Sequence, residues 1–208
     1  MAKIKSSFKN MLIVLTSITC LSGAILGGVS DVTKDAISAS KLSKQMDAIK
    51  LVAPEYDNNP IKDQWKVTLE DGTEAIIFPA TKNGEMVGAA VQAMTKNGFG
   101  GPISIMAGFD KDGTIKEYTV LSHSETPGLG SKMPEWFHNK GNILGKNPSK
   151  DNLTVSKDGG DVDAITAATI SSRAFLNAIA NAYNAFSNSN DANSGATHQN
   201  TDKKEEGK

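Results

Sequence analysis

The sequence contains few of the residues that build disulfides, metal sites and nucleic-acid surfaces. Its 208 residues include a single cysteine, Cys20, and an intramolecular disulfide is excluded because it needs two. The three histidines, His123, His138 and His198, are too scattered for the spacing of metal ligands. Lysines and arginines are dispersed, without the basic stripe that follows a phosphate backbone. We therefore expect neither a metal site nor a nucleic-acid partner.

Charged residues are absent between Lys9 and Asp31, and this apolar run predicts a transmembrane helix over residues 11–30. Such a helix spans roughly 30 Å, about the thickness of a hydrocarbon core. The alternative is a cleaved signal peptide, but the run is long for its apolar region and no small-x-small site directly follows. Lipidation of Cys20 is disfavoured because residues 18–19 lack a small residue. We expect a retained membrane anchor.

The charges on either side of this run predict its orientation. Lysines precede the run and aspartates follow it, at Lys3, Lys5, Lys9, Asp31 and Asp35. By the positive-inside rule, residues 1–10 lie in the cytoplasm and the remainder of the chain on the extracytoplasmic side.

Residues 31–187 have the pattern of one α+β domain. Apolar residues recur near helical spacing over residues 31–50, and a cluster with two prolines at 53–60 ends this helix. Five short apolar runs separated by turn dipeptides follow, which indicates antiparallel hairpins. They cover residues 65–69, 75–79, 86–94, 103–109 and 115–121. We expect an antiparallel sheet with flanking helices, and a disordered tail over residues 188–208, where no apolar residue larger than alanine occurs.

Two glycine-rich stretches interrupt the strands. Residues 96–102 lack the spacing of a P-loop or a dinucleotide-binding turn, so a wide turn is the simpler interpretation. Residues 123–133 place Leu129 between two glycines, after a proline that stiffens the loop. This second stretch is either a tight turn or a rigid clamp for a planar ligand. Trp136, just beyond it, either stacks on a ligand or packs against the core.

Small residues and hydroxyls gather where the last helix is expected to begin. Asp163, Thr166, Ala167, Ala168 and Thr169 precede a helical pattern of apolar residues. A helix start offers free N–H groups and the positive end of a dipole, which favour an anion such as a phosphate. The alternative is that Thr166 only caps an ordinary helix.

This segment resembles the acceptor motif of covalent FMN-binding domains. In that family a flavin transferase splits FAD and joins the FMN phosphate to the final Thr, which corresponds to Thr169. The sequence departs from the motif at Ala167, where the family usually has glycine. Alanine resists the positive φ that glycine adopts readily.

Other segments resemble the G subunit of Rnf-type electron transport complexes. The similarity includes residues 98–102, 125–130 and 57–60, together with the membrane anchor. It implies an electron-relay subunit, rather than a stand-alone enzyme, in a bacterial inner-membrane complex that couples ferredoxin and NAD redox chemistry to ion transport. The implied partners are the other membrane subunits and the flavin transferase. The C subunit of the sodium-pumping NADH:quinone reductase, which carries a similar motif but is generally longer, is the second choice.

The resemblance also implies roles for individual residues. Leu129 is expected to contact the flavin ring, the loop around it to hydrogen-bond the ring's polar edge, Thr166 to cap the helix, and Asp163 to be recognised by the transferase. The expected cofactor-binding residues are Glu125, Thr126, Leu129, Gly130, Thr166, Ala167, Ala168 and Thr169. A flavin-free extracytoplasmic binding module and a flavin-based membrane sensor remain alternatives.

Overall fold

The computed structural model describes the backbone of residues 8–195 and the side chains of residues 8–189. Contacts divide the chain into two compact units, Met1–Lys44 and Gln45–Lys208. The expectations for residues 1–7 and 196–208 lie outside the described residues.

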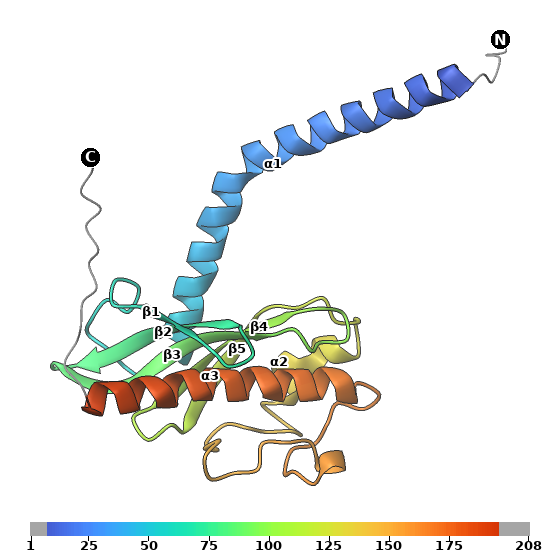
Figure 1. Ribbon diagram of the computed structural model, residues 1–208. Helices are drawn as coiled ribbons and strands as arrows, with labels where there is room; N and C mark the ends of the chain where they lie inside the picture. The colour runs from blue at the N-terminus through green and yellow to red at the C-terminus, as the bar shows by residue number, and fades with distance from the viewer. Residues whose placement is uncertain (1–7, 196–208) are drawn as a thin grey trace, which may run out of the picture. The chain divides into compact units, whose positions relative to one another are not determined.

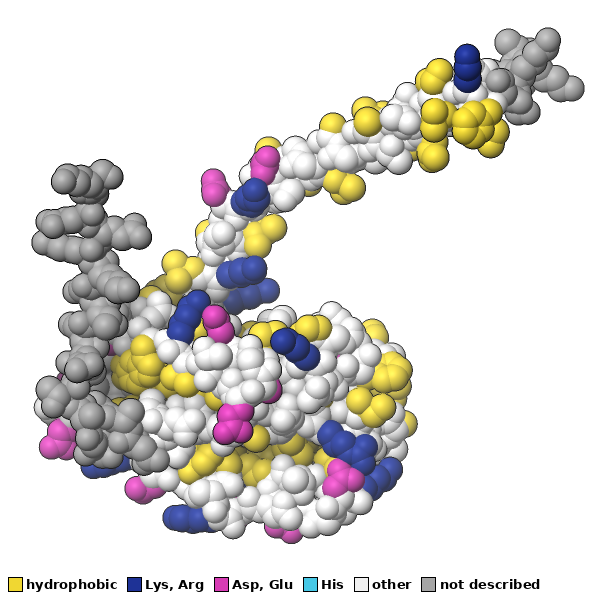
Figure 2. Space-filling model, in the orientation of Figure 1, with side chains coloured by type: hydrophobic (Ala, Val, Ile, Leu, Met, Phe, Trp, Pro, Cys, Tyr) yellow, Lys and Arg dark blue, Asp and Glu magenta, His cyan; other side chains and the backbone are white. Residues whose placement is uncertain are grey.

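Helix α1, Phe8–Val52, supplies all of the described part of the first unit. It is long and apolar enough to cross a membrane, judged by length and composition. Figure 2 shows hydrophobic side chains along its N-terminal part, with a basic side chain at the start of the helix and further charged side chains after the hydrophobic stretch. The Thr19 hydroxyl bonds back to the Leu15 carbonyl at 3.0 Å, which satisfies this polar group within the helix. The helix expected over residues 31–50 continues the same α-helix without a break.

The second unit is built on a five-stranded antiparallel sheet (Figure 1). The strands follow chain order, each paired with the next: β1 Trp65–Thr68, β2 Glu74–Lys82, β3 Glu85–Thr95, β4 Ile103–Asp110 and β5 Ile115–Ser122. All five apolar runs of the sequence therefore form strands. An antiparallel sheet with flanking helices confirms the α+β prediction. Tight turns such as Asn83–Gly84 explain the antiparallel pairing of consecutive strands.

Alternating side chains divide the sheet into two buried faces. Register pairs Ile77 with Val91, Val91 with Ala107 and Ala107 with Tyr118, and this row belongs to the larger core cluster. The neighbouring residue Phe78 belongs to a second cluster. Since successive residues of a strand point to opposite faces, each face needs its own cover.

Helix α3, Thr169–Gly195, covers the first face (Figure 1). Phe175, Ile179 and Phe186 are fully or almost fully buried there, and each such side chain contributes about 1.5–3 kcal/mol of hydrophobic stabilisation. Asn181 donates to the Met94 carbonyl at 3.0 Å and fixes the helix on β3. The helix continues to Gly195, so residues 188–195 are helical where the sequence predicts disorder.

The last turns of α1, which belong to the second unit, cover the opposite face. Ala48, Ile49 and Val52 are buried in the second cluster. Gly108 on β4 makes this approach possible, because a Cβ there would lie 1.7 Å from the Val52 carbonyl oxygen.

The segment between β5 and α3 folds over one end of the sheet. It contains η1 Gly130–Lys132, α2 Met133–Trp136 and η2 Ser156–Asp158. The Tyr118 hydroxyl donates to the carbonyls of Met133 and Pro134, at 3.0 and 2.9 Å. Phe137 stacks on Phe175 of α3 with ring centroids 4.3 Å apart. These contacts place the loop before α2 beside the start of α3.

Candidate functional site

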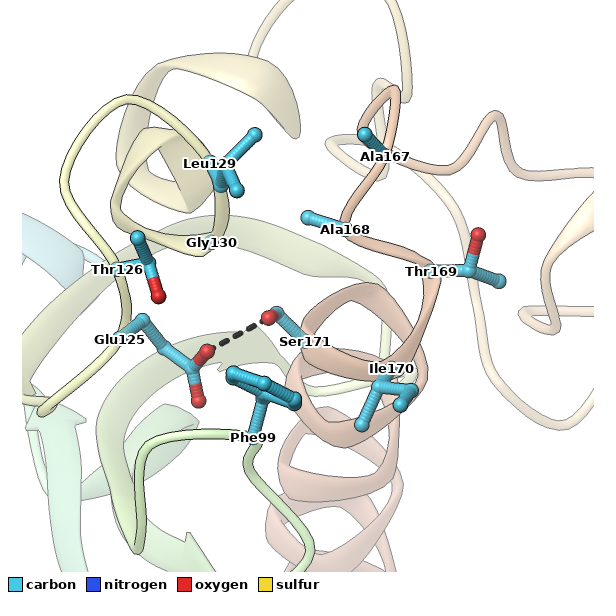
Figure 3. A pocket seen from close by; sticks show the side chains of 10 residues that line it. All are labelled: Phe99, Glu125, Thr126, Leu129, Gly130, Ala167, Ala168, Thr169, Ile170 and Ser171. Carbon is cyan, nitrogen blue, oxygen red and sulfur yellow. Dashed lines mark hydrogen bonds between the residues drawn. The ribbon is translucent and has the colours of Figure 1, made fainter.

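A cavity of about 340 Å³ lies where three segments distant in sequence meet (Figure 3). The segments are the loop between β3 and β4, the loop after β5, and the start of α3. The cavity is lined by Phe99, Glu125, Thr126, Leu129, Gly130, Ala167, Ala168, Thr169, Ile170 and Ser171. The fold thus brings together seven of the eight residues expected to bind a cofactor, and adds Phe99, Ile170 and Ser171.

The chain reaches α3 through an unusual backbone turn. Ala167 has a φ of 62°, in the left-handed region that glycine adopts most easily. For an alanine this conformation costs roughly 1–2 kcal/mol. The Ser172 hydroxyl holds the turn, accepting a bond from the Ile165 N–H at 2.9 Å and donating to the Ala168 carbonyl at 3.0 Å.

This turn changes the role expected for Thr166. Helix α3 begins at Thr169, and its first backbone bond runs from the Ser172 N–H to the Ala168 carbonyl. Thr166 therefore does not occupy the N-cap position, and it does not line the cavity. The physical reason is that the positive φ of Ala167 interrupts helical geometry after Thr166.

Thr169 occupies the first helical position of α3 and is half-buried. In Figure 3 its side chain is directed away from Glu125 and Ser171. Its hydroxyl oxygen lies 3.5 Å from the Lys157 ammonium nitrogen. Thr169 thus belongs to the first turn of α3, where free N–H groups favour an anion, and its hydroxyl lies near a cation, which favours an anion as well.

The carboxylate of Glu125 is buried behind the cavity, with 5% of the residue exposed. One oxygen accepts a hydrogen bond from the Gly100 N–H at 3.1 Å, and the other accepts one from the Ser171 hydroxyl at 2.6 Å. Glu125 therefore joins the three segments that form the site. We expected this carboxylate to bond a ligand, but the described contacts give it a role in holding the site together.

Close packing around Glu125 explains much of the glycine content of the two loops. A Cβ at Gly98 would lie 2.7 Å from one carboxylate oxygen, and a Cβ at Gly130 would lie 2.7 Å from the other. A Cβ at Gly100 would lie 1.9 Å from the Ser124 carbonyl oxygen. No side chain fits at these positions without displacing its neighbours.

Apolar side chains form the open side of the cavity. Phe99, Leu129 and Ile170 are 69%, 38% and 51% exposed. In Figure 3 Leu129 lies across the cavity from Ala167 and Ala168. Ile170 lies in the first turn of α3 and lines the cavity instead of packing in the core. Its exposure could not be read from the sequence pattern.

Asp163 lies outside the cavity and is exposed. Its carboxylate accepts a hydrogen bond from the Ser156 hydroxyl at 3.1 Å, and its carbonyl accepts one from the Trp136 indole N–H at 2.7 Å. Trp136 packs against the main core. Of the two interpretations of Trp136, the described contacts favour the core contact.

Near Thr169, an ion pair joins η2 to α3. The Arg173 guanidinium donates two hydrogen bonds to the Asp158 carboxylate, at 2.6 and 2.7 Å. These hydrogen bonds, together with the charge of Arg173, hold the pKa of Asp158 below its usual value. Both groups are partly exposed, so the pair serves geometry more than stability.

Comparison with known proteins defines the class of protein. A family model described as the FMN-binding domain matches residues 98–184. The matched range includes every residue that lines the cavity. The site therefore belongs to an FMN-binding domain.

The chain is also similar to proteins named as the G subunit of the ion-translocating oxidoreductase complex. The protein from Vibrio parahaemolyticus is 32% identical over 191 residues, covering 86% of this chain and 89% of the relative. That from Shewanella baltica is 32% identical over 196 residues, covering 89% and 90%. That from Salmonella typhi is 36% identical over 163 residues, covering 73% and 77%. The chain belongs to this family, the G subunits of Rnf-type ion-translocating oxidoreductase complexes, as the sequence resemblance indicated.

Proposed function

We propose that this protein is the electron-relay subunit of an Rnf-type ion-translocating ferredoxin:NAD oxidoreductase complex, with FMN joined by a phosphoester to Thr169. The observation that carries the proposal is the position of Thr169: the last residue of the acceptor motif begins α3 at the rim of an apolar cavity within the FMN-binding domain. When bound, FMN supplies the redox chemistry, and the protein supplies position and electrostatics.

The residues present fit such a cofactor in two parts. The start of α3 offers backbone N–H groups and the positive end of a long helix to a phosphate on Thr169. The cavity, of about 340 Å³, is at the small end of the range for ligand pockets. It suits an isoalloxazine ring in contact with Phe99 and Leu129, with the sugar-alcohol chain passing over its rim.

Glu125 and Ser171 support this arrangement from behind. Their hydrogen bond fixes the Leu129 loop against α3, and the Gly100 contact fixes the loop that carries Phe99. The two loops that contact the flavin ring would then already be fixed before the ring binds, so binding would cost less conformational entropy. Thr126 and the amide of Gly130 remain candidates for bonding the ring's polar edge.

The exposed Asp163 fits recognition by a flavin transferase. It belongs to the acceptor motif but does not line the cavity, so a role in holding the finished cofactor does not account for it.

Helix α1 and the membrane-complex relatives support an inner-membrane protein. Lysines before the apolar run and aspartates after it support an extracytoplasmic FMN-binding domain. The other subunits of the complex are the proposed electron-transfer partners.

The test is to co-express the full chain with an active flavin transferase and to measure its intact mass. We expect the mass of one attached FMN, a fluorescent band after denaturing electrophoresis, and loss of both in Thr169→Ala. Thr68→Ala, at an exposed threonine on β1 outside the acceptor motif, is the control and should keep the label. An unlabelled wild-type chain, with a control substrate labelled by the same transferase, would overturn the covalent proposal and favour a flavin-free module. A second test purifies the native membrane complex that contains this protein. If a sensor kinase were found in place of the Rnf subunits, the proposed electron-relay role would be overturned.

A further inference from the structure

Lys157 is placed to contact any group attached to Thr169. Its ammonium nitrogen lies 3.5 Å from the Thr169 hydroxyl oxygen. A lysine ammonium has three donors and no acceptor, so it donates in this contact. Among the described side chains, Lys157 makes no hydrogen bond or ion pair with a carboxylate.

The turn that carries Lys157 is held in place by its neighbours. The Ser156 N–H donates to the Val162 carbonyl at 2.8 Å, and Val155 is buried in the core. On the other side of Lys157, Asp158 is bound by Arg173 through two hydrogen bonds. Arg173 lies four residues after Thr169, so both are on the same face of α3. The ion pair therefore holds η2 beside the face that presents Thr169.

Arg173 and Lys157 differ in whether the described contacts pair them with a carboxylate. Asp158 neutralises Arg173, and the described contacts leave the Lys157 cation without an opposing carboxylate. A phosphodiester between two carbon chains carries a single negative charge at neutral pH. Lys157 is thus available to pair with the single charge that attachment adds.

We propose that Lys157 is the cationic partner of the phosphodiester on Thr169, positioned by the Asp158–Arg173 pair; the proposal rests on the function proposed above. In the attachment reaction, the Thr169 hydroxyl oxygen forms a bond to the flavin-side phosphorus of FAD. The bond between that phosphorus and the bridging oxygen breaks, and AMP leaves with this oxygen. The hydroxyl proton passes to a base of the transferase. No oxidation or reduction occurs, and Lys157 stabilises the negative charge beside the new ester.

The experiment compares Lys157→Gln and Lys157→Arg with wild type in the full chain, treated with FAD and a flavin transferase. Lys116→Gln, a change on an exposed lysine of β5, is the matched control. The initial rate of attachment is measured by intact mass. We expect Lys157→Gln to be about two- to fivefold slower, the effect typical of an exposed ion pair, and Lys157→Arg and Lys116→Gln to remain close to wild type. The difference should shrink in about 1 M salt, where the Debye length is near 3 Å.

A second measurement separates contact with the phosphate from recognition by the transferase. Fully labelled chains in a phosphorus-free detergent are compared by ³¹P NMR, and the phosphodiester resonance should move in Lys157→Gln and return towards wild type in Lys157→Arg. An unchanged resonance in Lys157→Gln would overturn the proposal, even if attachment were slower. A wild-type chain that takes no FMN would instead overturn the proposed function, so the two failures are distinct.

Discussion

The Ser171 hydroxyl donates a hydrogen bond of 2.6 Å to the carboxylate of Glu125, and this contact joins the loop after β5 to the first turn of α3. The other carboxylate oxygen is bound by the Gly100 N–H. One buried side chain therefore holds together the three segments that form the cavity. The site is organised around a structural carboxylate rather than around a reactive one.

Removing the Ser171 hydroxyl should destabilise the domain. Ser171→Ala leaves one buried oxygen of Glu125 without its donor, which costs about 1–3 kcal/mol. The free energy of unfolding is measured by denaturant titration of the detergent-solubilised chain, followed by near-UV circular dichroism. Ser189→Ala, on the same helix, removes a hydroxyl bonded to the Phe186 carbonyl and should cost less because that site is less buried. Equal losses would contradict the bracing role of Glu125.

Replacing Ala167 by glycine should stabilise the domain. The change removes the cost of a positive φ in alanine, roughly 1–2 kcal/mol. The greater conformational freedom of glycine in the unfolded chain costs about 0.4–1 kcal/mol, so the expected net gain is up to about 1.6 kcal/mol. Ala168→Gly is the matched control: its φ is not positive and its methyl is buried, so that variant should lose stability. The same titration tests both, and destabilisation by Ala167→Gly would show that the turn is not strained.

Truncating the exposed walls of the cavity should change the flavin's surroundings but not its attachment. In Phe99→Ala and Leu129→Ala, we expect full labelling by intact mass, together with stronger flavin fluorescence and easier quenching by iodide. The physical reason is that these two side chains cover apolar ring surface in the proposed complex. Leu51→Ala, at an exposed leucine on α1, is the control. Unchanged fluorescence and quenching in both site variants would place the ring elsewhere.

Tyr118 predicts a loss of stability at alkaline pH. Burial raises the pKa of its phenol well above the ordinary value of 10.0. Above about pH 10 the unfolded chain loses this proton while the folded chain keeps it, so stability falls as pH rises, by up to about 1.4 kcal/mol per pH unit. Below pH 10 the group makes no pH-dependent contribution. Tyr118→Phe should be less stable at neutral pH but should show a shallower decline between pH 10 and 11. If the free energy of unfolding fell equally steeply with pH in wild type and in Tyr118→Phe, the proposed effect of burial on the Tyr118 pKa would be contradicted.

Local sequence signals predicted most of the fold. Each of the five apolar runs became a strand, because alternating side chains and turns such as Asn83–Gly84 act over a few residues. The end of α1 at Val52, just before the predicted proline cluster, follows the sequence signals, but the same signals failed at both ends of α3. The start of α3 was expected near Thr166, but the left-handed turn at Ala167 delays it to Thr169. The continuation of α3 to Gly195 was missed because residues 188–195 have the polar composition of a disordered tail.

The sequence by itself determined the apolar span, the antiparallel sheet and the acceptor motif that ends at Thr169, since each depends on residues close together in the chain. Only the tertiary structure decided what surrounds that threonine. Glu125, Phe99 and Lys157 reach the site from three separate segments, and nothing in their local sequence specifies these contacts. Their meeting depends on the packing of α3 and the connecting loops at one end of the sheet. That packing gives Glu125 a bracing role and leaves Thr169 at the rim of the cavity.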